Sequence, residues 1–270
     1  MANGDAGTFT DLNETLAADS GWSLTSARDI NDAGQITGEG TYTSPDGTIR
    51  SEVDYLWELD AERFGKVTYV PMGPSDNENP SSLNNLAPPQ VVGSIGGESF
   101  IWQASAAGLT PLGHLGMAST QAWAINDLGQ VVGISDISAF LWTPGGTDGV
   151  ASNPQMRNLH PATGVQTSKA FDINNSGLVV GVGIYSPNGA YFGFSWERTT
   201  GWRDLNKVSI KPANWQLQFA RGCNDRTVNG LPSAQIISSG YIAVTTTVIV
   251  RKKKTTTTKN EPHGFLLTPQ

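Results

Sequence analysis

Asp29 and Asp172 occupy the same position in two copies of a repeated segment, and they are the first candidates for chemistry. Two carboxylates that face each other across a pocket can act as the acid and the base of glycosidic-bond hydrolysis. His114 and His160 follow equivalent segments of adjacent repeats, and two imidazoles with a carboxylate could hold a metal ion. No close spacing of ligands supports that metal site, so the sequence predicts no cofactor and leaves enzymatic activity open.

A larger set of aromatic and arginine residues could bind a ligand without reacting with it. Aromatic rings stack on sugar rings, and an arginine can hold a carboxylate through two hydrogen bonds. The candidates lie in the first strand of a repeat or in loops expected on one face, and they are Trp22, Arg28, Tyr42, Trp123, Phe171, Tyr185, Trp215 and Arg221. The alternative is structural: each tryptophan packs between repeats and each arginine pairs with a neighbouring residue.

A third candidate surface is a cluster of positive charge formed by Arg251, Lys252, Lys253 and Lys254. It follows a strongly β-forming run of Val, Ile and Thr residues and precedes a run of threonines. This pattern predicts a hairpin over about residues 240–262 that projects from the molecule and grips an acidic or protein partner. The alternative is that the charges only protect exposed strand edges from pairing with other chains.

An internal repeat must position these residues. The pattern Ile-Asn-Asp/Asn-x-Gly-x-Val-Val-Gly occurs at residues 30–38, 125–133 and 173–181, with degraded copies near 83–93 and 223–225. Asn and Gly adopt the positive φ angles that tight hairpin turns require. An aromatic segment and a further short apolar segment follow each copy. The sequence therefore predicts four strands per repeat and five repeats.

Four short antiparallel strands repeated roughly every 40 to 50 residues are typical of the blade of a β-propeller. We predict a single five-bladed β-propeller domain, with blades over about residues 21–73, 77–113, 118–160, 166–206 and 213–269. Phe9-Thr10-Asp11-Leu12 matches Trp202-Arg203-Asp204-Leu205, so a strand over residues 7–13 is expected to complete the fifth blade and close the ring. An open β-solenoid is the alternative.

One column of the aligned repeats is variable where its neighbours are uniform. It contains Arg28, Ser81, Trp123, Phe171 and Arg221, beside a column of apolar core residues. Variation on a repetitive scaffold marks where the repeats could differ in function. Because the first strand of a blade lies nearest the axis, these residues are expected near the mouth of the central channel.

The repeat resembles the bacterial HAF-repeat family, whose unit carries a His-Ala-Phe-Leu-Trp-Thr-Pro stretch near an Ile-Asn-Asp-x-Gly-Gln-Val-Val-Gly stretch. The resemblance spans nearly the whole chain and is strong in the first, third and fourth repeats, as at residues 125–133 and 139–144 of the third. It implies an extracellular repeat protein without an assigned activity, and it carries over no catalytic residue. The histidine of the family has a counterpart only in His263.

Composition narrows the possible functions. The net charge of −7 argues against binding to nucleic acid, and no apolar run is long enough to span a bilayer. The given sequence begins without a signal peptide, and its single cysteine, Cys223, can form no internal disulfide. With the resemblance, these features predict a secreted or extracellular protein whose loop face binds a glycan or other polymer. The alternatives are a polysaccharide hydrolase or lyase with an axial acidic pocket, and a protein-interaction scaffold.

Overall fold

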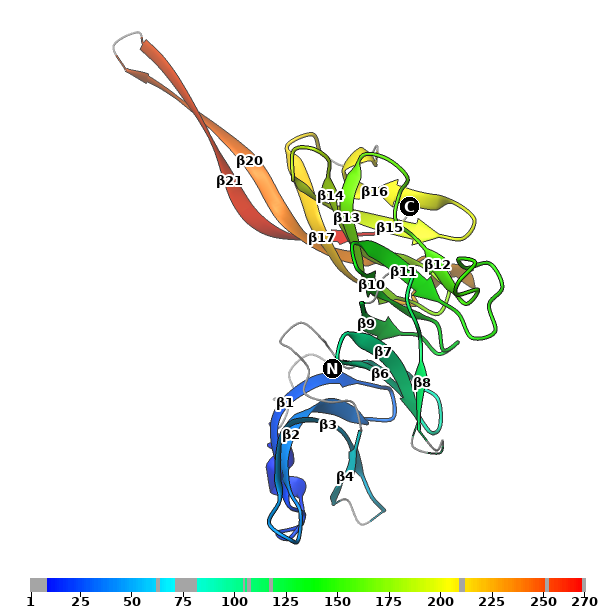
Figure 1. Cartoon of the computed structure of the whole chain (residues 1–270). Coiled ribbons are helices and arrows are strands. Elements are labelled where there is room, and N and C mark those ends of the chain that lie inside the picture. The colour runs from blue at the N-terminus through cyan, green and yellow to red at the C-terminus, as the bar shows by residue number, and fades with distance from the viewer. Residues whose placement is uncertain are drawn as a thin grey trace.

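The computed structural model of the protein is all-β, and five antiparallel sheets follow one another along the chain (Figure 1). The structure describes residues 9–61, 64–70, 82–103, 105, 108–116, 119–208, 212–250 and 253–268. Two short 3-10 turns, η1 (Leu12–Thr15) and η2 (Leu205–Lys207), are the only helices in these ranges. In the first four sheets, strands that pair are neighbours in sequence, so each of these sheets is a local meander.

The first four sheets have four strands each, ordered across the sheet as in the sequence. The first contains β1 (Trp22–Ile30), β2 (Ile36–Thr43), β3 (Ile49–Leu59) and β4 (Gly65–Tyr69). The second contains β5 (Ser82–Leu83), β6 (Gln90–Ile95), β7 (Glu98–Gln103) and β8 (Leu109–Pro111). The third contains β9 (Thr120–Ile125), β10 (Val131–Ser135), β11 (Ser138–Trp142) and β12 (Met156–Asn158). The fourth contains β13 (Val165–Ile173), β14 (Val179–Tyr185), β15 (Tyr191–Glu197) and β16 (Gly201–Asp204).

The fifth sheet differs from the others because it has three strands, in the order β17-β20-β21. These are β17 (Trp215–Cys223), β20 (Ile236–Val250) and β21 (Lys253–Leu267). A separate two-stranded sheet, β18 (Thr227–Val228) with β19 (Leu231–Pro232), is inserted between β17 and β20. The far ends of β20 and β21 extend beyond β17 as a long hairpin arm (Figure 1).

The repeated asparagine shapes the turn between the first two strands of each sheet. In the third sheet, the Asn126 side-chain oxygen accepts from the backbone N–H groups of Leu128, at 3.1 Å, and Gln130, at 2.9 Å. Gly129 follows with a φ of 71°, a backbone conformation that side chains disfavour. The same asparagine also donates to the backbone carbonyl of Asn174, in the corresponding turn of the next sheet, at 3.0 Å.

These bonds join the turns of all five sheets into an asparagine ladder. Each rung runs from an asparagine side-chain nitrogen to the backbone carbonyl of the equivalent residue in the next sheet, at 2.9–3.1 Å. The ladder residues are Asn31, Asn84, Asn126, Asn174 and Asn224. Consecutive sheets are thereby held side by side at one edge.

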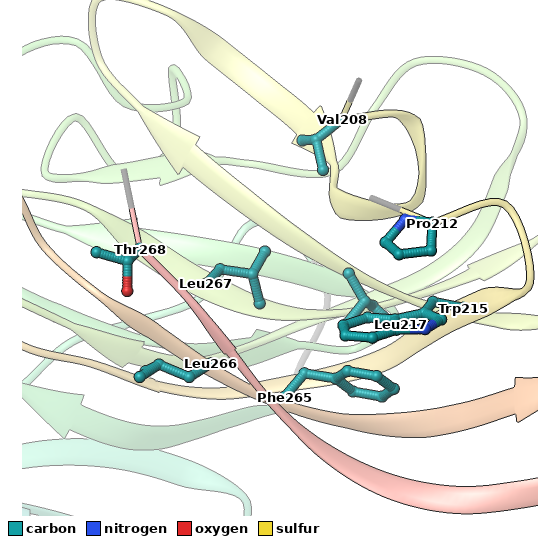
Figure 2. Close-up of a pocket in the computed structure, with 8 residues that line it drawn as sticks. All are labelled: Val208, Pro212, Trp215, Leu217, Phe265, Leu266, Leu267 and Thr268. Carbon is teal, nitrogen blue, oxygen red and sulfur yellow. The ribbon is translucent and has the colours of Figure 1, made fainter. Parts of the chain in front are cut away.

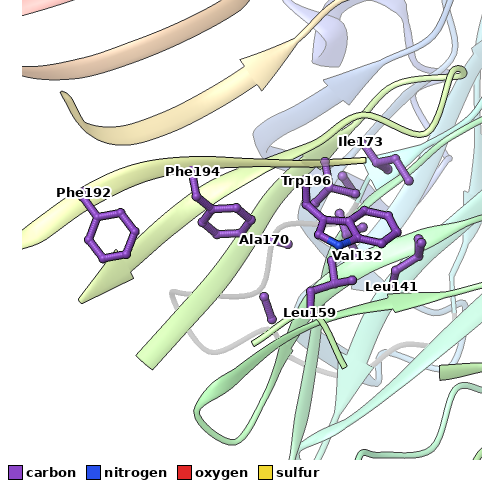
Figure 3. Close-up of a cluster of buried hydrophobic side chains, with 11 residues drawn as sticks. Val132, Leu141, Leu159, Ala170, Ile173, Phe192, Phe194 and Trp196 are labelled. Carbon is purple, nitrogen blue, oxygen red and sulfur yellow. The ribbon is translucent and has the colours of Figure 1, made fainter. Parts of the chain in front are cut away.

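Apolar side chains fill the space between consecutive sheets. Between the third and fourth sheets, Phe192, Phe194 and Trp196 of β15 pack with Ala170 and Ile173 of β13 (Figure 3). From the third sheet, the cluster receives Val132, Leu141 and Leu159, among others. Similar clusters separate the other pairs of consecutive sheets, so the core is a series of layers rather than one central mass.

The sheets do not close into a ring, and the prediction of a five-bladed propeller is wrong. Within the described ranges, the asparagine ladder ends at Asn224, whose side-chain nitrogen donates to Gln235 of its own turn at 3.2 Å. Among the residues that the structure describes, no hydrogen bond joins it to Asn31 at the other end of the ladder. The sheets instead pack face to face in sequence order, as layers of a sandwich do.

The N-terminal segment explains why the closure prediction failed. Its described residues form η1 against the first sheet rather than a strand of the fifth. Leu12 and Leu16 pack with Tyr55 and Trp57, and the Trp57 indole N–H donates to Thr15 Oγ1 at 3.1 Å. The matching motif at residues 202–205 spans both a fourth strand and the 3-10 turn after it, and only the turn forms at the N-terminus.

Candidate functional site

The variable column of the repeats coincides with a β-bulge in each sheet where it is described. The register between the first and second strands skips Arg28, Trp123, Phe171 and Arg221. The fifth member of the column, Ser81, lies outside the described residues. A bulged residue is left out of the regular ladder and its side chain is re-aimed, which is why bulges are frequent at functional sites.

A glycine on the second strand makes room for the bulge in the first, third and fourth sheets. A Cβ added at Gly133 would overlap the backbone carbonyl oxygen of Gln121, on the bulged strand. The same conflict arises at Gly38 and Gly181 in the first and fourth sheets, whereas Ser238 takes this position, opposite Ala220, in the fifth sheet. The final glycine of the repeat is therefore a packing requirement of the bulge.

Three of the bulged residues lie side by side across the third, fourth and fifth sheets. The ring of Trp123 lies 5.3 Å from that of Phe171, and the guanidinium carbon of Arg221 lies 4.9 Å from the centre of the Phe171 ring. Arg221 also lies 4.7 Å from the centre of the Phe219 ring. The Lys169 ammonium lies 5.4 Å from the centre of the Trp123 ring. We call these five residues the aromatic–cationic stripe.

A cavity of about 300 Å³ opens beside the stripe, between the fourth and fifth sheets. Its lining is mostly apolar, with few polar groups, and consists of Thr167, Lys169, Phe171, Val182, Ile184, Tyr191 and Phe219. The Tyr191 ring is exposed and lies 5.2 Å from that of Phe219. This volume is at the lower end of the range for small-ligand pockets, and the aromatic side chains of the lining could stack on a ring of a ligand.

The two cations of the stripe have no carboxylate partner among the described residues. Arg221 is exposed and Lys169 is half-buried, and neither belongs to any of the ion pairs found there. The charged groups of both residues lie over aromatic rings. An aromatic face attracts a cation but leaves its N–H donors available. A carboxylate or sulfate of a ligand could therefore receive hydrogen bonds from both.

Arg28, the bulged residue of the first sheet, has a different environment. Its guanidinium forms an ion pair with Glu39, and Asp54 lies opposite Glu39 on the neighbouring strand. Asp54 is only 2% exposed, and its Oδ1 has no hydrogen-bond partner among the described residues. Burial raises the pKa of Asp54 to about 7, against the lowering effect of Arg28 and with a further raising effect of Glu39.

Sequence reasoning missed Asp54 and Glu39. The sequence does mark Asp54, because this aspartate interrupts the otherwise apolar and buried run Val53–Trp57 of β3. A carboxylic acid within such a run is either satisfied by partners or has a perturbed pKa.

Asp29 and Asp172, the acidic pair suggested for catalysis, each hydrogen-bond to the following sheet. Asp29 Oδ2 accepts from the Ser82 hydroxyl at 2.7 Å and from the backbone N–H of Leu83 at 3.0 Å. Asp172 Oδ2 accepts from the backbone N–H of Cys223 at 2.8 Å. Burial raises the pKa of Asp172, and the charge of Asp29 adds to the effect. Each carboxylate thus ties its sheet to the first strand of the next sheet.

The remaining predicted ligand-binding residues do not join the stripe. Trp22 and Tyr42 contact each other in the first sheet, with ring centres 5.1 Å apart. Trp215 packs on Phe265 within the fifth sheet, at 4.8 Å. Tyr185 stacks on Phe192 at 4.0 Å and hydrogen-bonds through its hydroxyl to Asp204. Each of these rings contacts another aromatic ring of its own sheet.

The histidine pair gives no metal centre within the part of the chain that the structure describes. No group of three potential ligands occurs there. His160 is half-buried, its Nδ1 lies 2.9 Å from the Ser168 hydroxyl, and burial lowers its pKa. His114 is exposed, and its Nδ1 accepts from the backbone N–H of Gly116 at 3.2 Å.

The basic cluster lies at the far end of the hairpin arm. Lys253 and Lys254 begin β21, opposite Val250 and Ile249 of β20. Arg251 and Lys252 lie outside the described residues. The role of the cluster in binding a partner therefore stays a prediction.

Comparisons with known proteins identify no family for this chain. No family model matches the sequence, and no curated protein matches it. Among solved structures, it is similar to the extracellular domain of a putative hybrid two-component system from B. thetaiotaomicron, at 7% identity and a TM-score of 0.35. The match covers 87% of this chain and 40% of that domain, so this chain spans less than half of its length. The HAF-repeat resemblance stays a prediction.

Neither 3-10 turn is long enough to cross a membrane. They contain four and three residues, and no longer helix lies within the described ranges.

Proposed function

We propose that the protein is an extracellular binding protein for an acidic polysaccharide, with the aromatic–cationic stripe as its binding surface. The observation that carries the proposal is Arg221, an exposed guanidinium set between the Phe171 and Phe219 rings without a carboxylate partner among the described residues. Aromatic faces would stack on the sugar rings, while Arg221 and Lys169 would pair with the acidic groups.

The arrangement of the stripe favours a polymer over a small ligand. The bulged residues come from three consecutive sheets, so the stripe follows the direction in which the sheets succeed one another. The cavity beside it would accommodate part of a ligand, and the rest would extend past the exposed Arg221, since Trp123 itself is buried. The extracellular location belongs to this proposal, because the expected ligands are cell-surface and secreted polymers.

Charge supports an acidic ligand even though the whole chain carries a net charge of −7. Within a generally acidic protein, two cations without carboxylate partners form a local positive site. The negative charge of the surrounding protein would repel anions in general. An acidic ligand would therefore need to stack on the aromatic rings as well as pair with the two cations in order to bind.

Solution calorimetry with three polymers tests the proposal: a polyuronate, a sulfated polysaccharide and a neutral β-glucan. We expect binding of an acidic polymer that weakens at least about tenfold, equivalent to 1.4 kcal/mol, in Arg221→Gln and in Tyr191→Ala. Arg203→Gln, which removes another exposed arginine from β16 of the fourth sheet, serves as the matched control.

The outcomes separate the candidate functions. Wild-type binding that Arg221→Gln leaves unchanged would contradict the assignment of the stripe. Failure to bind all three polymers would contradict the glycan proposal itself, and the basic cluster with a protein partner would then be the surface to examine.

A further inference from the structure

Within the described part of the chain, the fifth sheet has no counterpart of the strand that completes every other large sheet. In the fourth sheet, β16 pairs with β15, with Trp202 opposite Trp196 and Asp204 opposite Phe194. In the fifth sheet, β21 corresponds to β15, and no described strand pairs with its outer edge. The backbone N–H and C=O groups of such an edge are a template for another strand.

An apolar groove accompanies this open edge. Leu267 and Phe265 of β21 lie beside Trp215 and Leu217 of β17, with Val208 and Pro212 across the groove (Figure 2). The groove has a volume of about 120 Å³. Leu266 of β21, which also lines the groove, is 63% exposed. The position therefore has both the hydrogen-bonding groups and the apolar surface that a fourth strand would cover.

The N-terminal segment is equivalent to the element that fills this position elsewhere. Asp11 caps η1 by accepting from the backbone N–H of Asn13, as Asp204 caps η2 by accepting from that of Asn206. Asn13 then holds both backbone groups of Leu24, at 2.7 and 3.0 Å. Asn206 holds both backbone groups of Leu217 in the same way, at 2.8 and 2.9 Å.

The equivalence ends at the preceding residues. Residues 202–204 belong to β16 and pair with the preceding sheet. Phe9 and Thr10 belong to no strand, and Phe9 is fully exposed. Among the described residues, the N-terminal segment thus has a fourth-strand sequence without a sheet, and the fifth sheet has no fourth strand.

We propose that Phe9–Asp11 of one copy of this chain forms the fourth strand of the fifth sheet in a second copy. By equivalence with the fourth sheet, Phe9 would lie opposite Leu267 and Asp11 opposite Phe265 of the acceptor. The first sheet of the donor would then stack on the fifth sheet of the acceptor, as the fifth stacks on the fourth within one chain.

The asparagine ladder supports the same arrangement. At the four internal rungs, each side-chain nitrogen reaches the carbonyl of the next sheet, but that of Asn224 reaches only Gln235 of its own turn. Asn31 of a donor copy would place the required carbonyl beside Asn224. This one contact between two copies would continue the ladder from Asn224 of the acceptor to Asn31 of the donor.

The contact is heterologous, because the donor and acceptor surfaces differ. Each copy carries one of each, so copies would add head to tail. Strand addition of this kind takes its affinity from main-chain hydrogen bonds and its specificity from the side chains that enter pockets. The phenylalanine at position 9 is the side chain that would make this contact selective.

Disulfide trapping between two separately prepared variants tests the proposal. Phe9→Cys and Leu267→Cys proteins, one of them carrying a mass tag, are mixed under mild oxidation. We expect a disulfide-linked species containing one tagged and one untagged chain. Thr200→Cys, an exposed loop position of the fourth sheet, replaces Leu267→Cys in the matched control and should give no such species.

Sedimentation over a concentration series gives a second readout that does not depend on the cysteines. The wild type should form head-to-tail species as concentration rises, and Phe9→Asp should raise the dissociation constant at least tenfold. Phe9 is fully exposed, so this change should leave the folded monomer intact.

Two results would overturn the proposal. One is a wild-type monomer at every concentration together with no mixed disulfide. The other is a double variant, Phe9→Cys with Leu267→Cys, that forms its disulfide within a single chain, because the N-terminal segment would then reach its own fifth sheet.

Discussion

The side-chain nitrogen of Asn126 donates to the backbone carbonyl oxygen of Asn174 at 3.0 Å, although 48 residues separate them in sequence. The side-chain oxygen of the same asparagine holds two backbone N–H groups of its own turn. One buried amide therefore does two tasks, shaping a hairpin and joining two sheets.

Replacing Asn126 with alanine should lower the free energy of unfolding by about 2–4 kcal/mol, because the loss leaves several buried polar groups without partners. Asn126 is 4% exposed, so water cannot readily replace the lost bonds. Urea titration followed by tryptophan fluorescence measures the change. Asn224→Ala is the control, because Asn224 is exposed and makes no bond to a following sheet. Equal losses in the two variants would contradict a special role for the rung.

Gly181→Ala should destabilise the fourth sheet, because the added methyl group would overlap the carbonyl oxygen of Lys169 and the ring of Phe194. The expected loss is about 1–3 kcal/mol, as for other cases of overpacking. Gly264→Ala is the matched control, since a Cβ there meets no atom within 4 Å. Comparing the denaturation midpoints of the two variants tests whether the bulge requires a glycine. A Gly181→Ala protein with wild-type stability would refute that requirement.

Stability should fall as the pH rises from about 4 to about 7, through the titration of Asp54. In the unfolded chain, an aspartate loses its proton near pH 4, whereas the pKa of folded Asp54 is raised to about 7. The folded state therefore binds more protons in this window, and the linked loss is at most about 4 kcal/mol.

Asp54→Asn should remove most of this pH dependence. Above pH 7, the variant should be more stable relative to the wild type than it is near pH 4. Glu58→Gln, a loss of one carboxylate from the same strand β3, is the control and should keep the wild-type slope. Thermal melts at half-unit steps of pH measure both. Equal slopes for the wild type and Asp54→Asn would rule out Asp54 as the titrating group.

Cys223 should resist thiol reagents in the native protein at pH 8. Burial raises the pKa of its thiol, the charge of Asp172 raises it further, and Sγ donates to the carbonyl of Leu178 at 3.4 Å. Because the thiolate is the reactive form, modification should follow opening of the fifth sheet. Labelling with a chromogenic disulfide should be slow in buffer and fast in urea, and rapid labelling of the native protein would contradict this account.

Binding of the acidic polysaccharide should weaken as salt is added. The contacts expected of Arg221 and Lys169 are between exposed or half-buried charges, which salt screens over about 8–10 Å at physiological ionic strength. In Arg221→Gln, the dependence of the dissociation constant on salt should become shallower. A salt-independent affinity in the wild type would indicate that stacking alone holds the ligand.

The repeat in the sequence predicts the five sheets and the location of the variable column. Both depend on short-range patterns, namely turn residues and alternating apolar positions. The bulge at Trp123, Phe171 and Arg221 could not be predicted in this way, because register depends on how two strands pair. The partner of Asp54 also depends on pairing, since Glu39 lies opposite it on another strand.

The prediction that the sheets close into a ring is wrong for a specific reason. The match of residues 9–12 to 202–205 identifies the type of an element but not the sheet to which it belongs. The 3-10 turn of residues 12–15 makes contacts with Leu24, which is close in sequence, so closing the loop between them costs little entropy. Pairing of the N-terminal segment with β21 would instead require the whole chain to curve back on itself.

The asparagine ladder also determines the order in which the molecule exchanges its amide hydrogens. Because every rung joins only consecutive sheets, a local opening reaches the rest of the chain through one junction at a time. The first and fifth sheets have a single neighbour each, so their amides should exchange earliest, and those of the third sheet latest. Protection should therefore peak at the centre of the sequence and decline toward both termini.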